Sequence, residues 1–411
     1  MDQPTRQSRA SRLLDLGGPL LRRLHLGPSR RSGQSLLAAA VGRARCDDWG
    51  DGPFREGLES LLDALRHDRH LRLTAWADIH EFLIGLLVNR LLIRQYQQRN
   101  PACLHEPIDR PIFILGLPRS GTTLLYRLLA LDPASRFVPY WESLYPAPLP
   151  DEPPGDVSPR LEATRQRLRR GSDLFADMPG IHAITADAPE ECLPLLMNSF
   201  VHGAFVLLAP VGRYLRWVAR QGLTGSYGYY RQQLQILQCR LRRRQWVLKA
   251  PLHVEGIEAL LAVFPDARII QTHRDPARTV PSTASYVAAS WTRFRRRADL
   301  PGLGQGVLDS WAGRMERFLA VRDRAVGVPF VDVLYDRLCR DPVAVVGEIY
   351  ARLGLEYTPA FEASMRDFLA RNPQGKHGQH RYSLEQFGLS RPAVEARFAG
   401  YCRRFGVTSE P

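Results

Sequence analysis

The stretch PIFILGLPRSGTTLLYRLLA, residues 111–130, constrains the fold of this chain more than any other. Residues 112–115 form a continuous apolar run, the pattern of a parallel strand buried on both faces. Residues 116–121 follow as a glycine- and proline-containing loop, and Thr122 and Thr123 open a segment whose leucines recur with a helical period. A loop that enters a helix N-terminus in this way presents unpaired backbone N–H groups and the positive end of the helix dipole, which suits a phosphate or another anion.

The loop is close to a Walker A motif but lacks its lysine. Thr122 follows Gly121 where G-x-x-x-x-G-K-[ST] has lysine, and the basic side chain stands earlier, at Arg119. The stretch therefore predicts anion binding without the usual equipment for triphosphate hydrolysis. The alternative is a glycine-rich turn without a ligand, but Arg119, Ser120, Thr122 and Thr123 place more hydrogen-bond donors there than packing requires.

Two later strands are predicted to end in functional side chains. Residues 245–251 indicate a strand that ends at Lys249, with His253 on the turn into the next helix. A second strand ends before Arg274, and Ser282 lies in the helix that follows it. Because ligands of parallel sheets bind at the carboxyl ends of the strands, we expect Lys249 and Arg274 beside the glycine loop. The guanidinium of Arg274 and the hydroxyl of Ser282 suit a second phosphate, and an Arg–Asp turn with a helix-surface serine is the alternative.

Basic residues are in surplus, and nearly all of them are arginine. The formal net charge is +14, and only two of the 56 basic residues are lysines, Lys249 and Lys376. Such a charge suits anionic ligands, nucleic acid or an anionic membrane surface. Lys376 lies in a glycine-broken, cation-rich stretch, residues 372–388, which predicts either a lid that closes over a charged nucleotide or an ordinary exposed loop.

Three glutamates are candidates for either a catalytic or a structural role. Glu142 follows an aromatic pair, and an apolar setting raises the pKa of a carboxylate, so Glu142 is the first candidate for a general base, with a surface glutamate as the alternative. Glu190 and Glu191 come directly after Pro189, and this order favours first-turn acids of a helix over catalytic residues.

The chain is expected to divide into an N-terminal part, residues 1–106, and an α/β part, residues 107–411. The first contains a basic tail and a helical extension that caps the structure. The second contains a helical insertion on the acceptor side, about residues 146–243, and the basic lid at about 372–388. Aromatic residues between 214 and 230 suit either an acceptor pocket or the core.

The cysteines are scattered and form no C-x-x-C pair. They indicate reduced, mostly structural thiols in a cytoplasmic protein rather than a disulfide framework or a zinc site. We also find no signal peptide and no apolar run of 18 residues or more, so we expect a cytoplasmic protein, with peripheral membrane contact as a possibility. The six cysteines are Cys46, Cys103, Cys192, Cys239, Cys339 and Cys402.

Taken together, the glycine loop, Lys249, Arg274-Asp-Pro and Ser282 resemble the sulfotransferases that use 3′-phosphoadenosine 5′-phosphosulfate (PAPS). The similarity is greatest to the bacterial branch that also resembles protein-tyrosine sulfotransferases. It covers about residues 107–290 and the basic loop near 372–388. It implies a P-loop-like parallel sheet flanked by helices, and a reaction that needs no metal.

The resemblance also implies roles for individual residues. Lys249 would neutralise charge that develops on the transferred group, and Arg119 would stand where the cytosolic branch carries lysine. Glu142 would deprotonate the acceptor hydroxyl, as in the tyrosine-sulfating branch, with His253 as the rival base by similarity to the cytosolic branch. The donor-binding residues would be Pro118, Arg119, Ser120, Gly121, Thr122 and Thr123 for the 5′-phosphosulfate, Arg274 and Ser282 for the 3′-phosphate, and Lys376 in the lid.

Two other classes of protein remain open at this point. A P-loop kinase or NTPase would show magnesium-dependent ATP turnover. A non-catalytic protein that binds anions or nucleic acid would bind DNA or RNA with a steep salt dependence. Under the sulfotransferase interpretation the partner is a small-molecule or glycolipid hydroxyl acceptor, with no nucleic acid beyond the nucleotide donor. The oligomeric state does not follow from the sequence.

Overall fold

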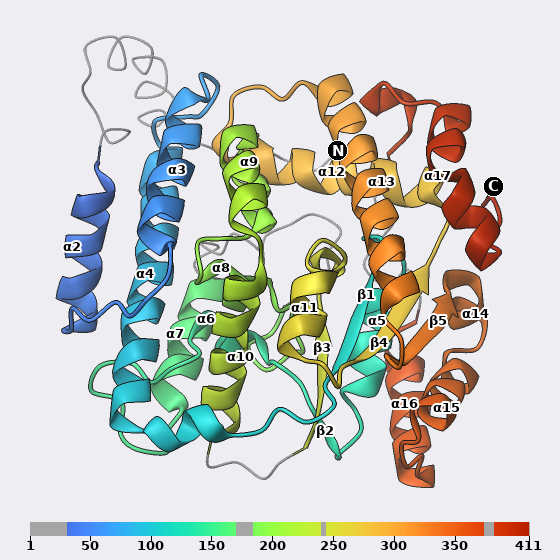
Figure 1. Cartoon of the computed structure of the whole chain (residues 1–411), viewed down its shortest axis with the longest axis horizontal. Helices are drawn as coiled ribbons and strands as arrows, with labels where there is room; N and C mark the ends of the chain where they lie inside the picture. Colours follow the sequence, from blue (N-terminus) through green and yellow to red (C-terminus); the bar gives the residue numbers. More distant parts are fainter. Residues whose placement is uncertain (1–30, 170–183, 240–243, 374–381, 411) are drawn as a thin grey trace.

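A five-stranded parallel sheet forms the centre of the protein (Figure 1). The computed structural model describes residues 31–169, 184–239, 244–373 and 382–410. The strand order is β2-β3-β1-β4-β5, and the predicted α/β class with a P-loop-like sheet is confirmed. The strands are β1 (Ile112–Gly116), β2 (Ser135–Arg136), β3 (Gln245–Lys249), β4 (Arg268–His273) and β5 (Phe330–Leu334).

The central strand β1 is buried along its whole length, as its apolar run predicts. Phe113 and Leu115 contribute to the core on one face of the sheet, and Ile112 and Ile114 contribute to the core on the other. In register, Ile114 pairs with Lys249 of β3, and Gly116 pairs with Thr272 of β4. The carboxyl ends of β1, β3 and β4 therefore meet at one edge, where the glycine loop leaves the sheet.

The smaller core lies between the sheet and four helices that follow β1 and β5. Leu125 and Leu128 contribute to it from the helix after the glycine loop, and Ile349 and Phe361 contribute from the C-terminal half. Figure 1 shows the helices that follow β5 grouped beside that strand. The helices are α5 (Thr122–Leu129), α14 (Tyr335–Arg340), α15 (Pro342–Leu353) and α16 (Pro359–Arg371).

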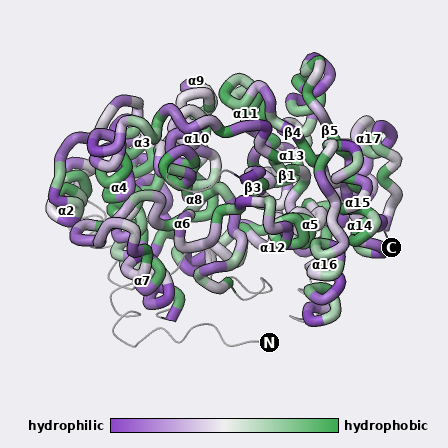
Figure 2. The backbone as a smooth tube through the Cα atoms, turned by 90° about the horizontal axis from the view of Figure 1, so that it is seen from below, coloured by the Kyte–Doolittle hydropathy of each residue, from purple (hydrophilic) through white to green (hydrophobic). Residues whose placement is uncertain are grey.

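The larger core covers the opposite face and joins the N-terminal helices to the sheet. Seen from below, α2, α3 and α4 lie at one end of the molecule, and β5 lies with α14, α15 and α17 at the other (Figure 2). The helices of this layer are α2 (Gly33–Ala44), α3 (Phe54–His67), α4 (Ala75–Arg99), α6 (Tyr140–Leu144), α7 (Ser158–Arg169), α8 (Leu193–Met197), α9 (Gly212–Gln221), α10 (Thr224–Gln238), α11 (Ile257–Val263), α12 (Pro276–Phe294), α13 (Leu300–Arg324) and α17 (Arg391–Phe405), with the 3₁₀ turns η2 (Pro101–His105), η3 (Gly203–Leu207), η4 (Pro251–Val254) and η5 (Glu385–Phe387).

Helix α4 explains why the N-terminal segment is so apolar. Residues on most of its circumference are buried, as the sequence pattern indicates. Two of its buried polar side chains pack against other elements: Asn89 donates to the carbonyl of Leu144 at 2.8 Å, and the guanidinium of Arg90 lies over the rings of Phe54 and Tyr229. The helix is thus packed between other elements. The division of the chain near residue 106 stays a prediction.

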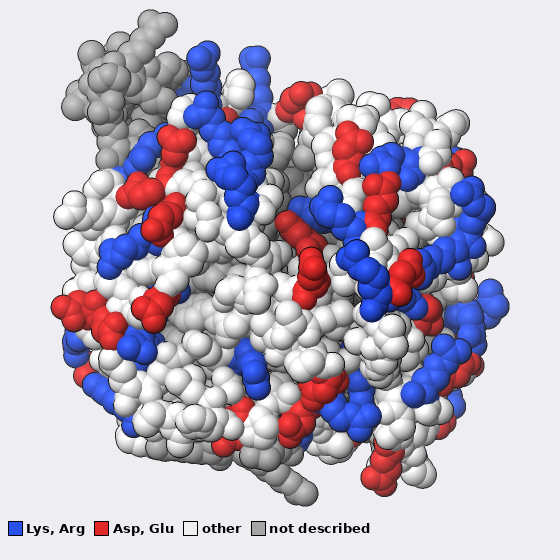
Figure 3. Space-filling view, in the orientation of Figure 1, with Lys and Arg blue, Asp and Glu red and all other residues white. Residues whose placement is uncertain are grey.

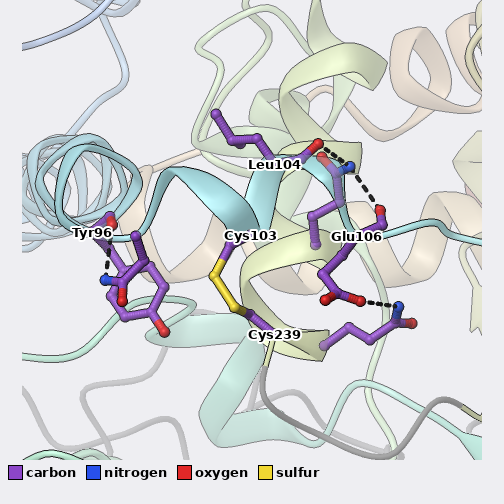
Figure 4. The surroundings of a disulfide bond; sticks show 8 residues. Tyr96, Cys103, Leu104, Glu106 and Cys239 are labelled. Carbon is purple, nitrogen blue, oxygen red and sulfur yellow. Dashed lines mark hydrogen bonds between the residues drawn. A yellow bond between two sulfur atoms is a disulfide. The ribbon is translucent and has the colours of Figure 1, made fainter.

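A disulfide joins Cys103 to Cys239, with their Cα atoms 5.3 Å apart (Figure 4). The expectation that all six cysteines are reduced is therefore wrong for this pair. The two residues are 136 positions apart, and their spacing carries no signal because tertiary packing alone brings η2 against the end of α10. Gln235 of α10 strengthens this junction by donating to the carbonyls of Leu104 and Glu106 at 2.7 and 2.9 Å. The junction anchors the segment that leads into β1.

Some predicted features lie outside the described residues. They include the first 30 residues of the basic tail and residues 374–381 of the predicted lid, with Lys376 among them. Across the ranges that the structure does describe, no helix combines the length and apolar character that a membrane span requires. Cytoplasmic location and peripheral membrane contact stay predictions.

Candidate active site

The glycine loop has the backbone geometry of an anion cradle. Gly121 has φ +90° and precedes α5, and Arg119 has φ +66°, a left-handed conformation that costs an arginine roughly 1–2 kcal/mol. Gly116 has φ +148°, and a Cβ atom there would lie 2.4 Å from the carbonyl oxygen of Thr272. Only glycine permits this close approach of β1 and β4. The loop is thus held in a compact, strained form.

Ser120 holds the loop together from within. Its Oγ lies 2.5 Å from the carbonyl oxygen of Leu117, to which it donates, and 2.6 Å from Oγ1 of Thr272. The side chain is fully buried, so its hydroxyl shapes the loop. The groups of this turn that stay open to an anion are the backbone N–H groups at the start of α5, the Thr123 side chain and the exposed Arg119.

Lys249 lies beside the loop, as its position at the end of β3 predicts. Its ammonium donates to Oε1 of Glu191 at 2.7 Å and to Oγ1 of Thr123 at 3.4 Å. It also lies 5.8 Å from the centre of the Tyr126 ring. Only 3% of the Lys249 side chain is exposed, against 25% of Glu191. Glu191 is therefore the solvent-accessible member of the pair, and Lys249 is the buried one.

The interpretation of Glu190 and Glu191 as first-turn acids is wrong. Helix α8 begins only at Leu193, and the segment before it is held against residues 138–139 by a bridge between Pro139 and Pro189 and by the hydrogen bond from Glu190 N to the Val138 carbonyl. This extended course carries Glu191 to Lys249. Burial raises the pKa of Glu190, although the nearby Lys249 opposes that shift.

Glu142 lies on α6 and pairs with Arg136. The Nη2 atom of Arg136 is 2.7 and 2.5 Å from the two carboxylate oxygens, and the guanidinium lies over the ring of Trp246 at the start of β3. Burial raises the pKa of Glu142, as the sequence analysis expects, while Arg136 opposes the shift. The carboxylate is thus committed to a nearly buried ion pair, and its role as a base stays a prediction.

His253 is a core histidine in this structure. It is fully buried against Phe113, and its Nδ1 lies 2.8 Å from the hydroxyl of Tyr227. Burial lowers the pKa of His253 to about 3, so the ring is neutral at physiological pH. Its other nitrogen, Nε2, is buried without a hydrogen-bond partner in the described part of the chain. The ring is shielded from solvent in this structure, and the role of His253 as a base stays a prediction.

Arg274 reaches the loop from the end of β4. Its Nη1 donates to the carbonyl of Arg119 at 3.0 Å, and its guanidinium lies 3.8 Å from the centre of the Tyr335 ring. The remaining donors bind the carboxylate of Glu410. Ser282 lies further along α12, where it is buried. The structure therefore places Arg274 beside the phosphate loop, as predicted.

Three residues at this edge were missed by the sequence reasoning: Glu191, Tyr335 and Glu410. Tyr335 directly follows β5, and a position at the carboxyl end of a parallel strand is itself a signal for a ligand site. Glu191 stood among several acids that suit a helix start, and Glu410 lies 136 positions from its partner. Pairwise contacts over such separations follow from the fold and leave no local pattern.

Charge on the visible face is mixed. Figure 3 shows lysine and arginine interspersed with aspartate and glutamate over most of this face, and the clearest basic group lies over α9. Exposed residues of that helix include Arg213, Arg216 and Arg220. The basic residues on this face are therefore interspersed with acidic ones, and they do not form the continuous basic stripe that is typical of a nucleic-acid-binding surface.

The parallel sheet, the glycine loop that enters α5, and the cations at the ends of β3 and β4 define a P-loop-like α/β protein with an anion site. The model of the sulfotransferase family matches residues 111–359, more than half of the chain. The chain belongs to this family and is an enzyme that transfers a sulfuryl group from a sulfate donor to a hydroxyl acceptor. This membership decides against the two alternative classes.

Relatives of known name or structure agree with this assignment. The chain is 27% identical over 314 residues to the omega-hydroxy-beta-dihydromenaquinone-9 sulfotransferase Stf3 of Mycobacterium bovis and of Mycobacterium tuberculosis, covering 74% of this chain and 77% of the relative. The crystal structure of sulfotransferase STF1 from Mycobacterium tuberculosis matches with a TM-score of 0.80 and 32% identity, over 91% of this chain and all of that chain. Sulfotransferase STF9 from Mycobacterium avium matches with a TM-score of 0.83 and 29% identity, over 92% of this chain and 97% of that chain.

Proposed function

We propose that this enzyme uses PAPS as its donor and a lipid hydroxyl as its acceptor. The observation that carries the proposal is a pair of neighbouring cationic positions at one sheet edge. Lys249 contacts Thr123 at the start of α5, and Arg274 contacts the carbonyl of Arg119 on the other side of the loop. A donor with a 5′-phosphosulfate and a separate 3′-phosphate needs two such positions. ATP and ADP have no 3′-phosphate and would use only one of them.

The residues present fit this donor. The N–H groups at the start of α5 and the exposed Arg119 suit the 5′-phosphosulfate, and the guanidinium of Arg274 has the planar fork that binds a phosphate. Tyr335 stacks on that guanidinium and orients it. The donor supplies the activated sulfuryl group, and the chain supplies the position and the compensating charge.

For the chemical step, we assign the base to Glu191 and the charge-stabilising cation to Lys249. The acceptor hydroxyl gives its proton to Glu191, its oxygen forms a bond to sulfur, and the bond from sulfur to the 5′-phosphate oxygen breaks. Lys249 lies between Glu191 and Thr123, so its ammonium is suited to compensate negative charge on the departing phosphate.

Glu142 and His253 remain rival candidates for the base. The contacts favour Glu191 over both, because Glu142 is held by Arg136 and His253 is fully buried against aromatic rings. Glu191, by contrast, keeps a quarter of its side chain exposed and touches the lysine that borders the phosphate loop. Independence from metal ions stays part of the proposal.

A lipid acceptor is suggested by the curated relatives, whose name specifies a hydroxylated dihydromenaquinone. The test is isothermal titration calorimetry with 3′-phosphoadenosine 5′-phosphate (PAP), ADP and ATP, followed by sulfuryl-transfer assays with long-chain and short-chain alcohols. We expect PAP to bind more tightly than ADP, and Arg274→Ala to remove that preference. Equal binding of PAP and ADP to the wild type would refute the donor assignment, and turnover confined to short alcohols would refute the lipid acceptor.

A further inference from the structure

The segment after α17 folds back onto Arg274. The carboxylate of Glu410 accepts two parallel hydrogen bonds from this guanidinium, Nε to Oε1 and Nη2 to Oε2, each 2.9 Å long. Both side chains are largely shielded from solvent, with 18% of Arg274 and 16% of Glu410 exposed. Arg274 is also the residue that the proposed function assigns to the nucleotide 3′-phosphate. A carboxylate of this chain therefore lies on the proposed phosphate ligand.

Several contacts hold Glu410 in this place. Arg391 donates from Nη2 to the Glu410 carbonyl at 2.9 Å and from Nη1 to the hydroxyl of Ser409 at 2.6 Å. The Glu410 backbone N–H donates to Oδ2 of Asp275 at 2.8 Å. Asp275 is the N-cap of α12 and directly follows Arg274. Arg274, Arg391 and Asp275 thus all hold the end of this segment in place.

These contacts occupy the fork of Arg274 that Nε and Nη2 form. The Nε and Nη2 atoms of Arg274 bind Glu410, and Nη1 donates to the Arg119 carbonyl. The planar face of the guanidinium lies on the ring of Tyr335. A carboxylate and a phosphate use the same bidentate geometry on a guanidinium, so the two anions compete for one position. A phosphate gains this position only when Glu410 leaves it.

We propose that Glu410 is an internal competitor for the nucleotide 3′-phosphate, and that donor binding displaces the segment 407–410 from Arg274. This inference rests on the proposed function. The carboxylate keeps the guanidinium paired while the donor is absent, and a doubly charged phosphate with more acceptor oxygens replaces it. Gly406, with φ +63° at the end of α17, provides the point at which the segment turns.

The first test compares Kd values for PAP and ADP by calorimetry in the wild type and Glu410→Gln. A site that is closed most of the time has an apparent Kd equal to the intrinsic Kd divided by the fraction of molecules in which the site is open. We expect Glu410→Gln to lower the Kd for PAP about five- to tenfold, and to change the Kd for ADP less than about twofold because ADP has no 3′-phosphate. The matched control is Glu81→Gln, which removes the carboxylate of another bidentate arginine pair, Glu81 with Arg43 of α2, far from residues 407–410.

The second test is hydrogen exchange on the wild-type protein, which needs no variant to fold. Addition of PAP should increase exchange at the backbone amides of residues 407–410, and ADP should not. A segment with a purely structural role would exchange at the same rate or more slowly. Unchanged or slower exchange with PAP bound overturns the inference.

The outcomes separate this inference from the proposed function. If the wild type and Glu410→Gln bind PAP equally while Arg274→Ala binds it weakly, the competitor is refuted and the donor assignment stands. If PAP binds neither the wild type nor Glu410→Gln, both the competitor role of Glu410 and the donor assignment are refuted. Tighter PAP binding by Glu410→Gln alone, with increased exchange in the wild type, supports the competitor.

Discussion

The ammonium of Lys249 lies 2.7 Å from the carboxylate of Glu191, although the two residues are 58 positions apart. The lysine comes from the end of a buried strand, and the glutamate comes from an extended segment that precedes α8. The pair joins the sheet edge that carries the glycine loop to the segment that precedes α8. Its position beside Thr123 makes it the chemical centre of the proposed reaction.

Replacement of Lys249 by methionine should lower kcat about 10²–10³-fold, the usual effect of losing one preorganised donor in a charge-stabilising site. Methionine preserves most of the volume, so the buried position remains filled. PAP binding should persist within about threefold, because the ammonium acts mainly on charge that develops during transfer. Steady-state kinetics and calorimetry on the same preparation check both parts. Unchanged kcat would remove Lys249 from the mechanism.

Glu191→Gln and Glu142→Gln form a matched pair that tests the base. Glu191→Gln should lower kcat about 10²–10⁴-fold, and it should also lower the free energy of unfolding because the buried Lys249 loses its charged partner. Glu142→Gln should leave kcat within about threefold but lower the free energy of unfolding by about 2 kcal/mol, because Arg136 loses its charged partner in a nearly buried pair. The reverse pattern of kcat values would return the base assignment to Glu142.

The buried His253 should make stability depend on pH. Its pKa is about 3 in the folded protein because of burial, against about 6.5 in the unfolded chain. Between these values the unfolded state binds a proton that the folded state does not, so stability rises with pH and is lost as pH falls below about 6.5. From pH 7 to pH 5 the wild type should lose about 1–2 kcal/mol more than His253→Asn. Urea unfolding at both pH values measures this difference, and equal losses would contradict it.

The disulfide should stabilise the oxidised protein. Replacement of Cys239 by serine should lower the free energy of unfolding by about 2–4 kcal/mol, because the bond closes a loop that spans 136 positions. Cys46→Ser is the control, since Cys46 is a free, partly exposed thiol. Denaturant unfolding with and without a reductant should show that reduction destabilises the wild type and leaves the Cys239→Ser variant unchanged. Insensitivity of the wild type to reductant would show that the bond contributes nothing.

Gly116→Ala should disturb the site through the backbone. The added Cβ would lie 2.4 Å from the Thr272 carbonyl oxygen, which belongs to the neighbouring strand and is not free to move. We expect a loss of about 2–4 kcal/mol in stability and weaker PAP binding. Gly85→Ala in α4 is the matched control, because a Cβ there meets no atom within 4 Å and alanine favours a helix. Thermal unfolding of both variants distinguishes a specific clash from a general intolerance of alanine.

The sequence by itself determined the local elements. The apolar run at 112–115 gave β1, the strand ends gave the positions of Lys249 and Arg274, and the glycine spacing predicted the loop into α5. These features follow from interactions between residues that are close in the chain, namely apolar periodicity and the φ values that glycine allows. The sulfotransferase class came from the resemblance of these motifs to a known family, and the motifs are local in the sequence.

Only the tertiary structure decided which distant side chains meet. The Cys103–Cys239 disulfide, the Lys249–Glu191 pair and the contact of Glu410 with Arg274 each join segments that have no local signal for one another. The same holds for Glu142, whose buried carboxylate is paired with Arg136. The physical reason is that such contacts depend on how the helices and strands pack, and packing is set by the whole core.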